Sequence, residues 1–398
     1  MASILYVTPW LRDGGIERAL QTEAPWLARR GHRVEVASWS ISELLAGHRN
    51  PVLATLETAG IRVRRLPARG RLQLCQRALT VAALALRSRV DVVIGQEFLG
   101  GVVALLAKAL TANWLTVAVE VHSASSTYIE TVKSQATLQL ARRLYRRADG
   151  IRAVSESVAG DAARFFGLPP RTISTIYNCF DLDEIRRLAA EDTPALIGLG
   201  PYVVACGRLV KLKGFADLID AFRVARARHA FKLIILGDGP DRAQLVAHAH
   251  ASGVAADVLF PGFVPNPFPY FARASAFIMS SRYGESFCRV LAEALACGAP
   301  VISSRCRWGP EEVLESGRYG RLYDVGDVGG LAEHMLDLLG QEKTIDLVDA
   351  GRRRAADFAV DRVLPTLEQF HLDIVAAGAR GRRRAVAHRE QPRLPLVG

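Results

Sequence analysis

The chain has 398 residues, of which 50% are hydrophobic and 23% charged, as expected for a globular protein with a large core and two or three domains. No apolar run reaches the roughly 18 residues that a membrane-spanning helix needs, and the start, MASILYVTPW, predicts a first strand rather than a signal peptide. The six cysteines form no CxxC pair, which argues against zinc and favours a reducing, cytoplasmic setting.

The net charge of +11 indicates an anionic partner. Nucleic acid, an anionic membrane surface and a phosphorylated substrate would each account for it. No helix-turn-helix, RNP or zinc-finger pattern accompanies the charge, so we expect no nucleic-acid partner. Most basic residues are arginines, which makes a lysine pair in one loop, Lys211 and Lys213, more noticeable.

Strand and helix patterns alternate along the first half of the chain. Helical spacing of apolar residues, as at Ile16, Leu20, Ala24 and Leu27, separates short strand patterns. The predicted strands are SILYVTPW (3–10), RVEVASW (33–39), IRVRRLP (61–67), VDVVIGQE (90–97), TVAVEVHS (116–123), GIRAVSE (150–156) and TISTIYN (172–178). Such alternation predicts βαβ units and a parallel sheet.

The alternation restarts after a linker-like segment that ends near residue 200. The predicted strands there are PYVVACG (201–207), FKLIILGDG (231–239), VLFPGF (258–263), AFIMSSR (276–282), PVISS (300–304) and RLYDV (321–325). We therefore predict an α/β protein with two Rossmann-like, doubly wound domains, 1–185 and 186–360, that face a central cleft. A helix over 361–378 is expected to pack across both domains, and the basic tail 379–398 is expected to be disordered.

The segment ESFCRVLAE places Glu285 and Glu293 eight residues apart, directly after a strand pattern and at the predicted start of an apolar helix. Eight helical residues rise about 12 Å, roughly the distance between the sugar and the ribose of a nucleotide diphosphate sugar. Carboxylates at the carboxyl end of a parallel strand lie where such sheets bind ligands. The alternative is an amphipathic helix with solvated glutamates.

Two further loops follow predicted strands and carry residues suited to phosphate. Arg208 and Lys213 lie between two glycines after the strand at 201–207, where a planar guanidinium and a compact ammonium can face phosphate oxygens. The spacing is not that of a P-loop. Gly14 and Gly15 precede the first helix and form an anion-friendly turn, although most glycine pairs are only turns.

His122 ends the strand pattern at 116–123 and is followed by a loop of small polar residues. A lone histidine is more often a structural residue with both ring nitrogens satisfied. Its place at the carboxyl end of a strand makes a role in lining the cleft an equal alternative.

The motifs together resemble those of the retaining glycosyltransferases of family 4, which have the GT-B fold. Each match is weak alone, but their order along most of the chain is specific. The matching segments are GGIE (14–17), VHS (121–123), VSES (154–157), NCFD (178–181), GRLVKLKG (207–214), GDGP (237–240), FPGFV (260–264), the two glutamates of ESFCRVLAE (285–293) and EALACGAPVISS (293–304).

The resemblance implies a nucleotide diphosphate sugar, with UDP favoured, as donor. By position, Glu285 would bind hydroxyls of the transferred sugar and Glu293 the ribose, while Arg208 and Lys213 would neutralise the leaving diphosphate. His122 would contact the sugar from the other domain. The remaining donor-binding residues would be Gly14, Gly15, Phe263, Val264, Ser286, Phe287, Cys288 and Val290. Many relatives have glycine where this chain has Ser286, which could instead cap the helix.

The resemblance also implies transfer of a hexose or N-acetylhexosamine to a glycan or lipid-linked glycan, with retention of configuration, in cell-surface polysaccharide synthesis. No metal or other cofactor is expected, and the DxD at Asp181 and Asp183 is interpreted as a helix start. The location expected is the cytoplasm, with peripheral contact to the inner membrane face through basic residues.

Three other classes of protein remain as alternatives. A sugar-nucleotide epimerase or hydrolase on the same fold would consume its donor without an acceptor. A nicotinamide oxidoreductase should show G-x-G-x-x-G after its first strand, which LRDGGIER lacks. A non-enzymatic binder of anionic surfaces would bind tightly at low salt without affinity for a donor.

Overall fold

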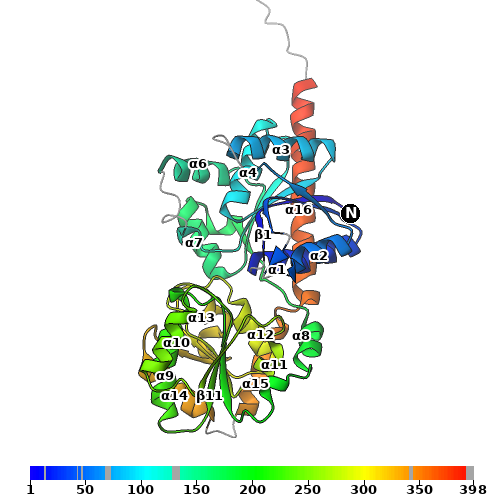
Figure 1. Cartoon of the computed structure of the whole chain (residues 1–398). Coiled ribbons are helices and arrows are strands. Elements are labelled where there is room, and N and C mark those ends of the chain that lie inside the picture. The colour runs from blue at the N-terminus through cyan, green and yellow to red at the C-terminus, as the bar shows by residue number, and fades with distance from the viewer. Residues whose placement is uncertain are drawn as a thin grey trace, which may run out of the picture. The chain divides into compact units, whose positions relative to one another are not determined.

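The computed structural model describes residues 1–12, 15–42, 44–45, 48–67, 73–127, 135–339 and 344–390. The chain divides into two compact units, one of Met1–Ile176 with Leu364–Gly398 and one of Tyr177–Val363 (Figure 1). The predicted domains, 1–185 and 186–360, differ from these units at both ends of the second one, because the chain leaves the first unit after Ile176 and returns to it at Leu364.

Within the described ranges, the first unit holds a parallel sheet of seven strands in the order β5-β2-β1-β6-β7-β8-β9. The strands are β1 (Ser3–Leu11), β2 (Arg33–Ile41), β5 (Arg62–Arg65), β6 (Val92–Gln96), β7 (Val117–Val121), β8 (Gly150–Ala153) and β9 (Ile173–Thr175). Each falls on a strand predicted from the sequence. The residues of β6 and β7 are all buried, and those of β1 nearly all, as in a sheet that is covered on both faces.

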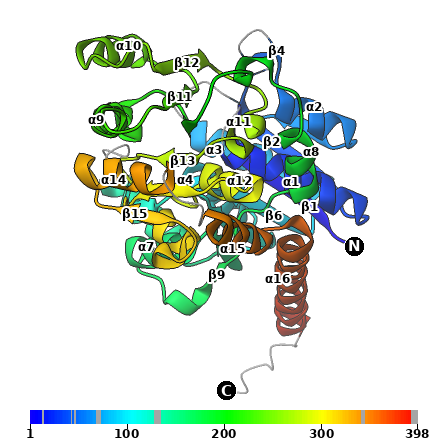
Figure 2. The same cartoon turned by 90° about the horizontal axis from the view of Figure 1, so that it is seen from below.

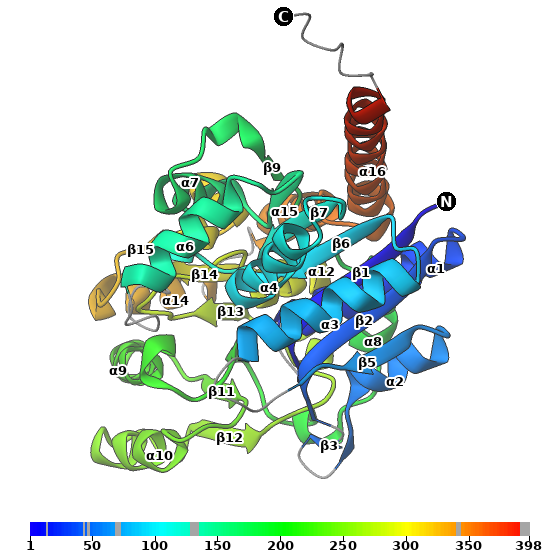
Figure 3. The same ribbon diagram turned by 90° about the horizontal axis from the view of Figure 1, so that it is seen from above.

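Two groups of helices cover the two faces of this sheet (Figure 3). Their apolar side chains are buried against it. The first group is α3 (Gln73–Arg87), α4 (Glu97–Leu110), α6 (Gln135–Tyr145) and α7 (Glu156–Phe166), and the second is α1 (Gly15–Arg29), α2 (Pro51–Thr58) and α16 (Val360–Glu390). A short hairpin of β3 (Leu44–Leu45) and β4 (His48–Arg49) was not predicted, because two-residue strands are too short to show a period.

The last helix, α16, differs from the prediction. It continues to Glu390, so the predicted helix end at residue 378 and the disordered tail from residue 379 are wrong up to that point. Residues 391–398 lie outside the described residues. The alanines and arginines of this segment are good helix formers, which explains why the helix continues. Ile374 of α16 lies in the core of the first unit.

The second unit has a parallel sheet in the order β12-β11-β10-β13-β14-β15. Its strands are β10 (Tyr202–Cys206), β11 (Lys232–Leu236), β12 (Val258–Gly262), β13 (Ala276–Met279), β14 (Val301–Ser304) and β15 (Arg321–Tyr323). Both sheets thus begin with the Rossmann order 3-2-1-4. In this order the second and third strands are added on one side of the first strand and the fourth on its other side, which makes a switch point between the first and fourth strands.

The helices of the second unit form two layers (Figure 2). One layer shares a core with the strands and consists of α9 (Phe215–Arg226), α10 (Arg242–Ala251) and α14 (Val328–Leu339). The other layer consists of α8 (Leu182–Ala189), α11 (Phe268–Ala272), α12 (Arg289–Cys297) and α15 (Thr344–Ala356). The short helix α13 (Gly309–Val313) contacts α12. None of the described helices is long and apolar enough to cross a membrane.

Candidate functional site

The switch point of the second sheet lies between β10 and β13, which are adjacent parallel strands. From β10 the chain continues toward β11 on one side, and from β13 it continues toward β14 on the other. The loops after these two strands diverge, so a ligand can bind between them. Lys213 ends the loop after β10, and Glu285 lies in the loop after β13.

Lys213 and Glu285 form an ion pair across these loops. The Nζ atom of Lys213 donates to Oε1 of Glu285 at 2.5 Å, and the Ser281 hydroxyl donates to the same oxygen at 2.6 Å. The two charged side chains are 30% and 20% exposed, so solvent reaches both. Burial alone would lower the pKa of Lys213, but the Glu285 carboxylate raises it, and the pKa ends above its ordinary value. The ammonium is therefore charged at neutral pH.

The loop after β10 approaches the end of β13 closely. Gly214 has a φ of +64°, and a Cβ there would collide with the carbonyl oxygen of Ser280, so only glycine fits. The Ser280 hydroxyl donates to the carbonyl of Lys213 at 2.8 Å. Arg208 is exposed at the start of this loop, and its neighbour Gly207 lies beside the Lys213 side chain, 3.7 Å from Cε to an ideal Cβ. The ion pair itself consists of Lys213 and Glu285, and Arg208 is not one of its members.

The backbone of Glu285 is held from both sides. Its N–H donates to the carbonyl of Arg307 at 3.0 Å, and its carbonyl accepts from Gly309 N–H at 2.6 Å. Between these contacts lies Trp308, with a φ of +75°, whose indole occupies the space that a Cβ on Gly284 would need. Positive φ at a bulky residue is costly, and such conformations concentrate at functional sites.

The helix after this loop begins later than predicted. Helix α12 starts at Arg289, after Cys288 in the left-handed conformation, so the prediction of a continuous helix from Glu285 is wrong. The residue at the N-cap position is Cys288 rather than Ser286. Phe287 is buried in an aromatic cluster of the second unit.

Two other predicted donor-binding segments have distinct surroundings. Glu293 is buried within α12, and its Oε1 lies 3.7 Å from the guanidinium of Arg289. Phe263 directly follows β12 and is 54% exposed, which is unusual for a phenylalanine. Val264 and Val290 are half-buried.

The cysteines near the ion pair are not suited to nucleophilic chemistry. Burial raises the pKa of Cys288 well above its ordinary value and, together with Glu285, raises the pKa of Cys306 to about 11. Both therefore remain thiols at neutral pH. All six cysteines are free, and four of them are buried.

The DxD segment has the structural role that the sequence predicted. Asp181 is the N-cap residue of α8, where its side chain accepts from the N–H of Glu184 at 3.0 Å. Asp183 pairs with Arg186 at 2.8 Å on the exposed side of the same helix.

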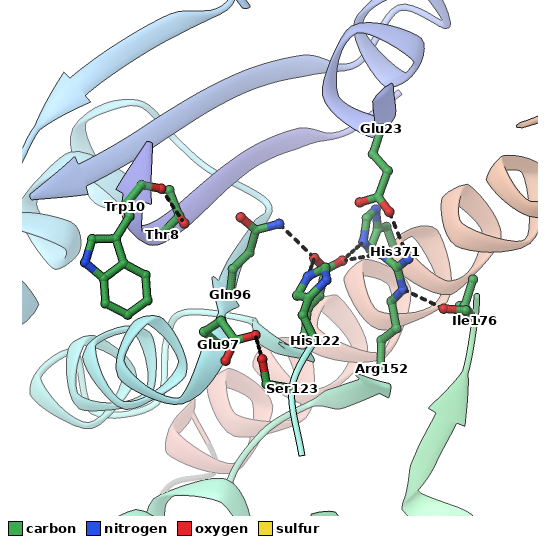
Figure 4. Close-up of polar contacts among 11 residues, drawn as sticks. Thr8, Trp10, Glu23, Gln96, Glu97, His122, Ser123, Arg152, Ile176 and His371 are labelled. Carbon is green, nitrogen blue, oxygen red and sulfur yellow. Dashed lines mark hydrogen bonds and ion pairs between the residues drawn. The ribbon is translucent and has the colours of Figure 1, made fainter. Parts of the chain in front are cut away.

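In the first unit, His122 follows β7 and is buried, with its Nε2 atom 3.4 Å from Oε2 of Glu120 (Figure 4). Glu120 also accepts from Arg152 at 3.1 Å, and Arg152 donates to Glu23 at 2.8 Å. These side chains belong to a charged network in the interior of the unit. Of the predicted glycines, Gly14 lies outside the described residues, and Gly15 is the first residue of α1.

Sequence reasoning missed several of these residues. Ser281, Trp308 and Arg152 carry no local signal, because their roles depend on contacts that are distant in sequence. The pairing of Glu120 with His122 could have been found, since residues two apart in a strand lie on the same face.

Together, the Rossmann-type strand order and the lysine–glutamate pair at its switch point define a two-domain α/β protein with a candidate ligand site in the second unit. Comparisons with known proteins also find two domains in the chain. The model of the family described as "Glycosyl transferase 4-like domain" matches residues 14–179, and that of "Glycosyl transferases group 1" matches residues 200–341.

Similar proteins include an N-acetylgalactosaminyltransferase of Campylobacter jejuni that acts on N-acetylgalactosamine-N,N'-diacetylbacillosaminyl-diphospho-undecaprenol. It is 31% identical over 200 residues, which are 50% of this chain and 53% of that protein. N-acetyl-alpha-D-glucosaminyl L-malate synthase of Bacillus anthracis is 26% identical over 77% of this chain and 80% of its own length. The chain thus matches only about half of the first relative's length.

Among solved structures, HepE of Anabaena in complex with UDP has a TM-score of 0.77 at 22% identity, covering 92% of this chain and 98% of that one. The chain therefore has the GT-B fold. Models of glycosyltransferase domains match both of its halves, residues 14–179 and 200–341.

Proposed function

We propose that the protein is a retaining glycosyltransferase of family 4 that moves a hexose or N-acetylhexosamine from a nucleotide diphosphate sugar, with UDP as the favoured nucleotide. The observation that carries the proposal is the Lys213–Glu285 pair at the switch point of the second sheet. An ammonium suits the diphosphate and a carboxylate suits sugar hydroxyls, so the pair can hold both sides of the bond that breaks.

In this mechanism, the bond from the anomeric carbon to the phosphate oxygen breaks as charge develops on the diphosphate. The Nζ atom of Lys213 has three N–H donors, and the two that do not face Glu285 can bind phosphate oxygens. Arg208, exposed on the same loop, adds a second cation. The acceptor oxygen bonds to the anomeric carbon on the same face, and its proton passes to the leaving phosphate oxygen.

The other residues are assigned to the rest of the donor. Glu293 would bind the ribose hydroxyls, with the guanidinium of Arg289 3.7 Å from its carboxylate. The exposed ring of Phe263 would contact the base, because an aromatic face stacks on any base. His122 would contact the transferred sugar from the first unit. No metal is needed in this mechanism, since lysine and arginine supply the positive charge.

The acceptor is proposed to be a glycan or lipid-linked glycan of a cell-surface polysaccharide. The name of the Campylobacter jejuni relative includes an undecaprenol diphosphate acceptor, which supports this class. We also propose that the protein works in the cytoplasm, at the inner membrane face. Three exposed arginines of the first unit, Arg143, Arg146 and Arg147, offer a basic surface, whereas Arg142 is engaged with Phe165.

The test is a thermal-shift and turnover experiment with UDP-, GDP- and ADP-sugars. One donor should raise the melting temperature of the wild type, and release of the nucleoside diphosphate should depend on added acceptor. The anomeric configuration of the product, measured by NMR, should match that of the donor. Donor consumption without an acceptor would instead support an epimerase or hydrolase, and binding of none of the donors would reject the proposal.

Membrane contact is tested separately by flotation with vesicles that contain anionic lipid. Binding should weaken as salt rises and should fall when Arg143, Arg146 and Arg147 are replaced by glutamine. Absence of binding at low salt would remove the peripheral location while leaving the transferase proposal intact.

A further inference from the structure

The carboxylate of Glu120 lies in the interior of the first unit with four side chains around it (Figure 4). Its Oε1 accepts from Arg152 at 3.1 Å and lies 3.6 Å from Nε2 of His371 on α16. Its Oε2 accepts from Gln96 at 3.1 Å and lies 3.4 Å from Nε2 of His122. The side chains of both glutamates, both histidines and Arg152 in this network are at most 2% exposed.

The protonation of this carboxylate determines where the His122 proton lies. Burial would raise the pKa of Glu120, but Arg152 and the two histidines hold it well below its ordinary value, so Glu120 is ionised at neutral pH. An ionised carboxylate can only accept hydrogen bonds. The ring nitrogen that faces it, Nε2 of His122, must therefore carry hydrogen, and a neutral ring then has its lone pair on Nδ1.

A second buried histidine of the same unit shows what a purely structural role looks like. Nδ1 of His32 accepts from the backbone N–H of Ala2 at 3.2 Å, and its Nε2 pairs with Glu368 at 2.9 Å. Both ring nitrogens of His32 are thus satisfied within the protein. By contrast, Nδ1 of His122 is buried and has no hydrogen-bond partner among the described residues, and the same holds for both ring nitrogens of His371 on α16.

The position of His122 in the sheet suggests that its Nδ1 atom binds a ligand. His122 directly follows β7, whose neighbour β6 ends at Gln96, so it lies at the carboxyl edge of the sheet, where ligands of such folds bind. A buried acceptor without a partner costs free energy and calls for a hydrogen-bond donor. Hydroxyl groups of a sugar are donors of the required kind.

We propose that Glu120 is a positioning residue that fixes His122 as the Nε2–H tautomer, so that Nδ1 accepts a hydrogen bond from a hydroxyl of the bound sugar. This rests on the proposed function, which supplies the sugar. Arg152 holds Glu120 in place, because it also donates to Glu23 at 2.8 Å and to the carbonyl of Ile176 at 3.1 Å.

The variant Glu120→Gln tests the proposal, because Arg152 determines how the new amide lies. The amide oxygen must face Arg152, so the NH2 group faces His122 and turns its Nε2 into an acceptor. The Oε1 atom of Gln96, which has no described partner, can accept the other N–H after an amide flip. We expect the His122 tautomer to invert to Nδ1–H and kcat/KM for the donor to fall by up to about 10-fold, since the sugar hydroxyl must then rotate to accept from Nδ1–H instead of donating to Nδ1.

The tautomer is read from ring ¹⁵N shifts of ¹⁵N-histidine-labelled protein, with His122 assigned by its loss in a His122 variant. The matched control is Glu368→Gln, the same change beside the structural His32, which should alter kcat/KM by less than about twofold. If wild-type His122 carries its proton on Nδ1, or if inversion in Glu120→Gln leaves kcat/KM unchanged, the proposal is overturned.

Two substitutions of the histidine itself decide the matter if Glu120→Gln does not fold. The side-chain amide of His122→Asn lies near the place of Nδ1, and that of His122→Gln lies near Nε2. The asparagine variant should therefore retain at least about fivefold more kcat/KM than the glutamine variant. Equal loss in both would overturn the positioning role. Absence of turnover in the wild type would instead reject the proposed function, while the ¹⁵N shifts would still report the tautomer.

Discussion

Replacing Lys213 by methionine separates the chemical role of the lysine from its structural role. The substitution shortens the side chain by one atom and removes the charge. Glu285 then retains the Ser281 hydroxyl at 2.6 Å and both backbone contacts, and its side chain is 20% exposed, so water can replace the ammonium. We therefore expect a stability loss of only about 1–2 kcal/mol, below that of a fully buried pair.

The expected loss of activity is larger. A cation directed at the charge that develops on a leaving diphosphate contributes to the transition state, and removal of one such group costs roughly 10²- to 10³-fold in kcat. That corresponds to about 2.7–4 kcal/mol, which exceeds the expected change in stability. Lys213→Met should thus be folded and almost inactive at 25 °C, with a melting temperature lowered by about 2 to 8 °C.

The assay is release of the nucleoside diphosphate at saturating acceptor, with a melting curve of each variant. Lys211→Met is the matched control, because Lys211 lies two residues away in the same loop and is exposed. It should keep kcat/KM within about twofold. Turnover of Lys213→Met within threefold of the wild type, or an equal loss in Lys211→Met, would refute the reasoning.

Three further results are expected. Gly284→Ala should displace Trp308, shifting the tryptophan emission and reducing kcat/KM by about tenfold, at a stability cost of about 1–3 kcal/mol; an unchanged spectrum would contradict this. Burial would raise the pKa of Glu368, but His32 and Arg30 lower it overall. The ionised carboxylate therefore stabilises the folded protein above pH ~4.3, and this stabilisation is lost as pH falls through the lowered pKa. In urea titrations, Glu368→Gln should therefore be less stable than the wild type at pH 7 by about 1 kcal/mol, and the difference should vanish near pH 2. EDTA should leave turnover unchanged, because Asp181 caps a helix; a loss that Mn²⁺ restores would refute this.

The fold and the central pair could be predicted because they depend on short-range patterns. Alternating strand and helix periods give parallel βαβ units, and the carboxyl ends of parallel strands gather at one edge of a sheet. Residues just after β10 and β13 were therefore predicted at the same edge. The structure places Lys213 and Glu285 there in direct contact.

The conformation of the loop after β13 could not be predicted from its own residues. The sequence from Glu285 to Glu293 has good helix formers, yet Cys288 is left-handed and α12 begins only at Arg289. The cause lies outside the segment, since Glu285 makes an isolated bridge with Trp308. Similarly, the network around Glu120 joins β7 to α1, β8 and α16, which local patterns do not connect.

Each unit joins a glutamate to a basic side chain near the carboxyl edge of its sheet, but the difference in burial gives the two pairs different uses. Glu285 and Lys213 are partly exposed, so an incoming phosphate or hydroxyl can replace part of their mutual contact at little cost. Glu120 and His122 are buried, so separating them would leave an ionised carboxylate short of a donor, which costs several kcal/mol. The pair in the second unit can therefore exchange partners during a reaction cycle. The pair in the first unit cannot, and its consequence is a fixed orientation of the His122 ring.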